Sequence, residues 1–190
     1  MKLTLIILTL IFFSSCGIQH RFATTKEANA DSSYIYSLPY PNGKSHLVLQ
    51  GYNSQLSHKG RTSLDFKMKN GAPITAARNG VVSRVVKEFS KGGVNKKYLR
   101  SANLIVVTHN DGSSAMYGHL KQNGALVNIG DTVKIGQIIG KAGSTGYSAM
   151  PHLHFSVFAP PDKGRKQIPT RFRTTKGVLY LKPGKWYRAL

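Results

Sequence analysis

The sequence predicts a mainly β protein, an antiparallel β-sandwich or β-roll with few or no helices beyond an N-terminal signal segment. Three stretches rich in β-branched and aromatic residues, at 81–89, 102–109 and 151–158, are bounded by turn-forming Gly, Pro, Asn or Asp. Beyond the signal segment, no stretch gives a confident helical pattern. Short strands separated by turns favour antiparallel sheets that stack or roll on each other.

The first 15 residues have the pattern of a secretory signal peptide. Lys2 precedes a run of apolar or small residues at 3–13, which is too short to span a bilayer because a spanning helix needs about 20 residues. Two small residues before Cys16 resemble the lipidation motif of bacterial lipoproteins, in which Cys16 would carry the lipid. The alternative is a plain signal peptide followed by an incidental cysteine. Residues 16–44 are expected to be the lipidated cysteine and a polar tether.

The charge balance is strongly basic, with 27 Lys and Arg against 7 Asp and Glu and a formal net charge of +20. Such a charge predicts attraction to a polyanion, which could be nucleic acid, anionic lipid or an anionic cell-wall polymer. Export through the signal peptide argues against nucleic acid as a partner. We therefore expect an exported protein, held at the membrane through lipidated Cys16, that faces the periplasm or cell wall and its anionic polymers.

Residues 45–160 are expected to form the functional domain. Its first strand is predicted at 45–50, and the Asn110-Asp111-Gly112 turn joins the strand at 102–109 to a returning strand at 113–117. The basic stretch between residues 87 and 100 is expected to be an exposed loop.

Two later stretches complete the expected fold. Residues 127–143 contain a Gly-Asp-x-Val-x-x-Gly-Gln pattern similar to the hairpin of biotinyl and lipoyl carrier domains, but no Lys stands at a hairpin tip to carry a prosthetic group. We take this as shared hairpin architecture. Residues 161–190 hold nine Lys or Arg residues and are expected to be a basic extension with closing strands at 177–181 and 186–187.

The stretch that indicates function is the strand at 151–158, because His152 and His154 alternate with apolar residues and so point to one face. Two solvent-facing histidines on a half-buried strand are the simpler interpretation, and a metal site is the alternative. Upstream candidates are His58, His119 and Asp65, the carboxylate with the least obvious turn or tail role. Asp65 could also be a loop-capping residue.

A catalytic zinc usually has three protein ligands from His and carboxylate side chains, with water in the fourth position. Five candidate residues would leave two imidazoles for moving protons or stabilising an oxyanion. The zinc would lower the pKa of its water to about 7 and polarise a carbonyl.

The motifs that carry these residues resemble those of the lysostaphin/LytM-type zinc metallopeptidases, peptidoglycan endopeptidases with a compact β fold. They are His58…Asp65, Tyr117-Gly118-His119-Leu120 and His152-Leu153-His154, supported by Gly143-Ser144-Thr145-Gly146. The resemblance covers about residues 50 to 160.

It implies that His58, Asp65 and His154 bind Zn²⁺, while His119 and His152 act on water and the oxyanion. The family commonly has three residues between the first His and the Asp, whereas this chain has six. Tyr52 lies where some members carry an oxyanion-stabilising tyrosine, and simple packing is its alternative role.

The expected function is therefore a zinc-dependent endopeptidase that hydrolyses peptide bonds in peptidoglycan stems or cross-links. The alternative is a catalytically inactive relative that acts as a binding or activating module for another wall hydrolase. A carrier domain is a more distant alternative.

Overall fold

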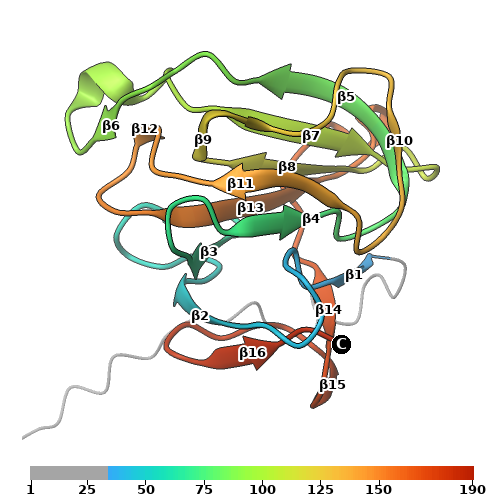
Figure 1. Cartoon of the computed structure of the whole chain (residues 1–190). Helices are drawn as coiled ribbons and strands as arrows, with labels where there is room; N and C mark the ends of the chain where they lie inside the picture. Colours follow the sequence, from blue (N-terminus) through green and yellow to red (C-terminus); the bar gives the residue numbers. More distant parts are fainter. Residues whose placement is uncertain (1–33) are drawn as a thin grey trace, which may run out of the picture.

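The computed structural model describes residues 34–190, which fold as a nearly all-β protein with mostly antiparallel sheets, as the sequence predicts (Figure 1). The predicted signal peptide and Cys16 lie outside the described residues. The strands are β1 (Ile35–Ser37), β2 (Ser45–Gln50), β3 (Ser63–Lys67), β4 (Pro73–Thr75), β5 (Gly80–Val86), β6 (Gly92–Gly93), β7 (Leu104–Thr108), β8 (Ser114–Gly118), β9 (Leu120–Ala125), β10 (Thr132–Val133), β11 (Ile138–Ala142), β12 (Gly146–Tyr147), β13 (His152–Phe158), β14 (Arg171–Thr174), β15 (Gly177–Leu179) and β16 (Trp186–Arg188). Two short 3₁₀ turns are η1 (Lys96–Tyr98) and η2 (Pro161–Lys163). Among residues 34–190, none of the helical segments has the length and apolarity that a membrane crossing requires.

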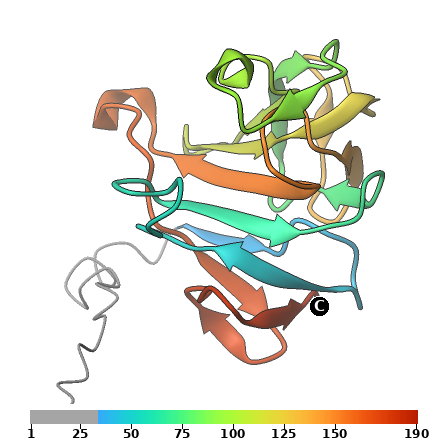
Figure 2. The ribbon, with the colours of Figure 1, turned by 90° about the vertical axis from the view of Figure 1, so that its left-hand side faces the viewer.

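The main sheet has eight strands in the order β10-β5-β7-β8-β13-β3-β2-β16. β13 lies inside it, antiparallel to both β8 and β3, and Figure 2 shows β13, β3 and β2 side by side. Its apolar side chains Leu153, Phe155 and Val157 are buried, as expected for a strand that packs its apolar face against the core. A strand held by neighbours on both sides is a rigid support for the two histidines that alternate with these residues.

A second sheet, in the order β4-β11-β9, covers part of the main sheet (Figure 1). Ile74, Leu120 and Ile139 from its three strands are fully buried in the common core. β12 and β6 form a small parallel pair through Gly146 and Gly92 at the end of the molecule. This pair fixes the loop after β11 that contributes to the site described below.

The N-terminal part of the described chain corrects one expectation. Residues 34–40 fell within the predicted tether, yet Tyr36, Leu38 and Tyr40 are buried in the core and β1 pairs in parallel with β14. The apolar side chains at every second position from Tyr34 to Tyr40 drive this burial, because alternation puts them all on one face of an extended chain. Any tether therefore ends before residue 34, and β1, β14 and β15 form a third sheet.

Candidate active site

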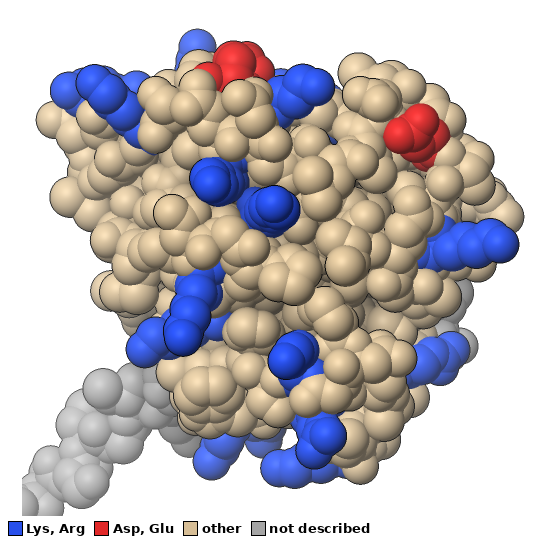
Figure 3. All heavy atoms as spheres, viewed as in Figure 1, with Lys and Arg blue, Asp and Glu red and all other residues tan. Residues whose placement is uncertain are grey.

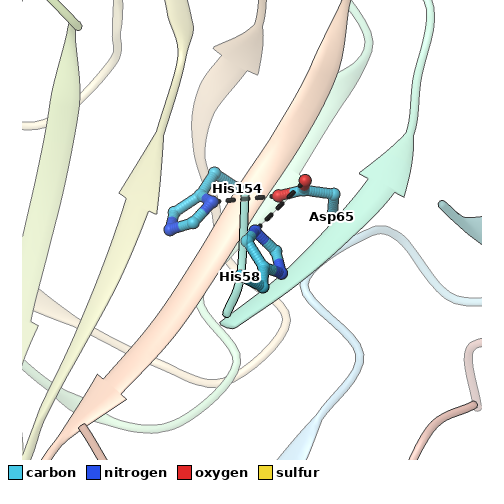
Figure 4. Close-up of side chains that lie close together, drawn as sticks. All are labelled: His58, Asp65 and His154. Carbon is cyan, nitrogen blue, oxygen red and sulfur yellow. Dashed lines mark hydrogen bonds and ion pairs between the residues drawn. The ribbon is translucent and has the colours of Figure 1, made fainter. Parts of the chain in front are cut away.

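The sheet register places four of the five predicted residues within reach of one another. His154 on β13 lies directly opposite Asp65 on β3, so the two side chains share a face. The His154 Nδ1 atom is 2.9 Å from Asp65 Oδ1, and the His152 Nε2 atom is 3.7 Å from the same oxygen. His58 arrives from the loop before β3, with Nε2 3.3 Å from Asp65 Oδ2 (Figure 4).

The loop that carries His58 accommodates the six-residue spacing to Asp65 by closing on itself. The Asn53 N–H donates to the carbonyl of Arg61 at 2.9 Å, and the Arg61 N–H donates to the carbonyl of His58 at 2.8 Å. The extra residues turn outward, with Lys59 exposed, while His58 turns inward and is only 1% exposed. A longer loop therefore still delivers the imidazole to the carboxylate.

Gln50 is a site residue that the sequence reasoning missed. A register shift between Val48 and Gln50 brings Gln50 opposite Asp65, as β-bulges near functional sites often do. Its Nε2 donates to Asp65 Oδ2 at 2.7 Å and to Ser57 Oγ at 2.9 Å, while its Oε1 accepts from the Ser57 N–H at 3.1 Å. One amide thus ties the carboxylate to the loop residue just before His58. The register shift, which only the fold reveals, was the missing signal.

Main-chain carbonyls set the tautomers of three of the histidines. The Nδ1 atoms of His58, His119 and His152 lie 3.1, 2.7 and 2.8 Å from the carbonyl oxygens of Gly51, Thr145 and Met150 respectively. A carbonyl can only accept, so Nδ1 is the donor in each contact, and in the neutral form of each ring Nε2 would carry the lone pair. The orientation resembles that of metal-binding or proton-accepting imidazoles, whose remaining N–H is held by a backbone carbonyl.

His119 joins the group from the junction of β8 and β9. Its ring centroid is 4.6 Å from that of His152 and 5.7 Å from that of His154. Its φ of +62° is in the left-handed region, which is uncommon for a residue other than glycine and often marks a functional position.

Gly143 makes the support for His119 possible. An added Cβ there would lie 2.6 Å from Lys121 Cα, so only glycine lets the 143–146 segment approach this backbone. Within that segment, Thr145 Oγ1 donates to the Leu120 carbonyl at 2.7 Å, and the Thr145 carbonyl accepts from His119. The motif glycine therefore has a packing role beside the imidazole.

Tyr52 is not brought to this cluster. Its hydroxyl donates to the carbonyl oxygen of Thr170 at 3.0 Å and accepts from the Thr170 N–H at 3.0 Å. Its ring packs edge-on against Tyr180, with centroids 6.4 Å apart. Burial raises the pKa of Tyr52 to about 12, against smaller lowering by the Thr170 hydrogen bonds. In this arrangement, packing is the role that its contacts support.

Comparison with known proteins shows the family of this chain. A sequence model of peptidase family M23 matches residues 58–168, more than half of the chain. The chain belongs to peptidase family M23. It is 37% identical to lysostaphin of Staphylococcus simulans over 134 residues, which are 70% of this chain and 24% of lysostaphin. It is 32% identical to the peptidoglycan DD-endopeptidase ShyB of Vibrio cholerae over 140 residues, 68% of this chain and 30% of that protein.

The solved structure of lysostaphin from Staphylococcus simulans has a similar fold, with a TM-score of 0.52 and 32% identity over 65% of this chain and 47% of that chain. The matched part thus spans less than half the length of each of these relatives.

The cofactor of this M23 site is Zn²⁺, and the donor set fits it. One ligand atom each from His58, Asp65 and His154 lies within 4.8 Å of the other two, and two imidazoles with a carboxylate are a common catalytic zinc set. The buried Nε2 of His58 makes no hydrogen bond to a side chain or main-chain group of the described residues and faces Asp65 Oδ2 3.3 Å away. A cation bound between the imidazole and the carboxylate would give this buried nitrogen a partner. The Nε2 of His154 lies 3.1 Å from Ser156 Oγ and can donate the ring proton to it. In that tautomer Nδ1 carries a lone pair and is available to bind the metal.

The electrostatics keep Asp65 ionised and His119 neutral. Burial raises the pKa of the Asp65 carboxyl, but hydrogen bonds with His154 and His58 and the charge of the histidines lower it by more, so it stays well below its usual range. Burial lowers the pKa of His119 to about 4, helped by repulsion from His152 and His154. Burial also lowers the pKa of His154, partly offset by Asp65. A carboxylate anion beside neutral imidazoles is the state that a cation requires.

Proposed function

We propose that this protein is a zinc-dependent endopeptidase that hydrolyses peptide bonds in peptidoglycan stems or cross-links. The observation that carries the proposal is the convergence of three ligand-type side chains, in which His58 Nε2 faces Asp65 Oδ2 and His154 Nδ1 faces Asp65 Oδ1. Two further imidazoles, His119 and His152, present lone pairs beside this set. Relatives named as a glycyl-glycine endopeptidase and a peptidoglycan DD-endopeptidase support peptidoglycan as the substrate class.

His58, Asp65 and His154 would hold the zinc, which supplies a Lewis acid that activates water and polarises the scissile carbonyl. His119 is neutral near pH 7, and its Nδ1 is fixed by the Thr145 carbonyl, so its Nε2 can accept the proton of the attacking water. The proton that His119 takes from water would then pass to the leaving amine. His152, whose Nδ1 is fixed by the Met150 carbonyl, would stabilise the oxyanion when its Nε2 carries a proton from solvent. Gln50 keeps the carboxylate aligned.

The cellular setting belongs to the same proposal. We place the protein outside the cytoplasm, exported by residues 1–15 and anchored through a lipidated Cys16 to a membrane. The net charge of +20 would then hold the domain against anionic envelope polymers.

Digestion of purified cell walls tests this function. We expect the full chain to release soluble peptide-linked fragments with new amino termini, and a zinc chelator to stop the release. His154→Ala should lose both bound zinc and activity. A chain that binds wall material yet releases no fragments at any zinc concentration would instead be the inactive binding relative.

A further inference from the structure

A groove on the C-terminal strands lies outside the residues matched by the family, and nothing in the mechanism uses it. Residues 176–187 line this hollow of about 450 Å³ beside β15 and β16, and we call it the C-terminal groove. The lining side chains that matter here are Lys176, Leu179, Tyr180, Lys182, Lys185 and Trp186. Clefts of this size, with an apolar lining and a few charged groups, suit elongated organic ligands.

The lining of the groove is positively charged. Lys176, Lys182 and Lys185 are exposed, and none of the residues that line the groove is an Asp or Glu. Figure 3 shows Lys and Arg, but no Asp or Glu, on the lower part of the visible face, where Figure 1 places β15 and β16. An anionic ligand would therefore meet only attraction from the lining side chains.

Trp186 gives the groove an apolar face as well. It is the only tryptophan of the chain and is 60% exposed, next to the half-buried Leu179 and Tyr180. Burying an aromatic ring of this size against a ligand would remove a large apolar area from water. A sugar ring, with a flat face of C–H groups and polar edges, matches an aromatic surface bordered by lysines.

The groove is attached to the active-site loop. The Gly184 N–H donates to the Val48 carbonyl at 2.9 Å, and the Val48 N–H donates to the Lys185 carbonyl at 3.0 Å, so this segment is fastened to β2. β2 ends at Gln50, the residue that holds Asp65. On the other side, Tyr180 packs against Tyr52 in the same stretch. A polymer seated in the groove is thus held by the chain segment that leads into the metal site.

We propose that the C-terminal groove binds an anionic glycan strand of the cell wall, with a sugar ring on Trp186 and carboxylates near Lys176 and Lys185. The choice of this polymer rests on the proposed function, since a peptidase of the wall would gain from holding a glycan strand that lies beside the strands whose peptides it cuts. The carboxylates are the lactyl groups, which are free wherever a stem peptide has been removed. The groove would raise the local concentration of substrate without taking part in hydrolysis.

The test uses glycan strands from which an amidase has removed all peptide stems, leaving free lactyl carboxylates. These strands contain no peptide bond, so the zinc-loaded full chain can be titrated with them whether or not it is a peptidase. Because Trp186 is the single tryptophan, its fluorescence reports the groove directly. We expect saturable binding with a change in Trp186 emission, weakened by added salt because exposed charges are screened.

Variants separate this groove from general charge. Calorimetry measures the affinity of each variant for the glycan. Trp186→Ala should weaken binding by about fivefold or more, whereas Trp186→Tyr should retain most of the affinity. Lys176→Gln and Lys185→Gln should each weaken it by about twofold to fivefold. Lys134→Gln, an equally exposed lysine on a different hairpin, is the matched control and should change nothing.

Several results would overturn the proposal. Unchanged affinity in Trp186→Ala and in both groove lysine variants would exclude the groove as the glycan-binding site. An equal loss of affinity in Lys134→Gln would show that net charge, and not the groove, causes the binding. Tighter binding of a phosphodiester polymer, or of phosphatidylglycerol vesicles, than of glycan would assign the groove to another ligand. If glycan binds as expected while wall digestion fails, the groove stands and the peptidase proposal falls.

Discussion

Replacing Gln50 by Ala is the most informative test of how the metal site is built. The substitution removes the donor to Asp65 Oδ2 at 2.7 Å and both contacts with Ser57, but no expected zinc ligand. A hydrogen bond to a charged group contributes about 1.5–3 kcal/mol, and Gln50 is only half-buried, which favours the lower part of that range. Loss of about 1.4 kcal/mol corresponds to tenfold in an equilibrium constant. Partners of metal ligands typically change metal affinity by about 10–100-fold.

We therefore expect Gln50→Ala to bind Zn²⁺ at least about tenfold more weakly than the parent chain, measured by competition with a chromophoric chelator. Excess zinc should restore much of the activity, because the ligands remain. Gln55→Ala is the matched control, since Gln55 is exposed in the same loop and makes no hydrogen bond within residues 34–190. Equal zinc affinity in Gln50→Ala and the parent, or an equal loss in Gln55→Ala, would refute the argument that this amide aligns the carboxylate.

Three further predictions concern the other histidines and the motif glycine. His119→Ala should keep its zinc but lose about 10²–10⁴-fold in turnover of a soluble peptide substrate, and loss of the zinc instead would make His119 a ligand. Gly143→Ala should lower the unfolding temperature and the activity together, because its Cβ would press on Lys121, and an unchanged melting curve would contradict this contact. Burial lowers the pKa of His109, helped by Arg78 against the Asn79 hydrogen bond. The pKa of His109 in the folded state is below the unfolded value of about 6.5. Its contribution to the free energy of unfolding is therefore complete above pH 6.5 and is lost as pH falls toward the folded pKa. Urea unfolding at pH 7 and pH 5 should therefore show a smaller pH effect in His109→Gln than in the parent, and equal effects would contradict it.

The strand pattern of the sequence predicted the framework of the site well. Local alternation places His152 and His154 on one face, and β13 occupies the predicted position with Leu153 and Phe155 buried. Alternation works here because β13 is a strand with two neighbours, where side-chain direction follows from position alone. The same rule applied to Tyr34–Tyr40 would have revealed that this segment is buried, but its turn-forming residues suggested a tether.

The rest of the site depends on contacts between distant segments, which a local pattern does not contain. Gln50 faces Asp65 only because β2 shifts register after Val48. Nothing in the sequence around Val48 and Gln50 predicts that shift. Tyr52 had the expected position along the chain, but its hydroxyl meets Thr170, 118 residues away, in a segment where no chemistry was predicted. The position of a side chain in the structure therefore followed from the local pattern for the strand residues, whereas the contacts of Tyr52 could not be predicted from its position in the sequence.

The main chain controls the chemistry of this site more than the composition of its side chains suggests. Three carbonyls, from Gly51, Thr145 and Met150, fix which nitrogen of His58, His119 and His152 carries the proton. These contacts are made by main-chain atoms, so moving the backbone by an ångström would turn an imidazole away from the metal. A chain could keep all five polar residues and still lose the site if that backbone changed, so the ligand motif alone does not establish activity.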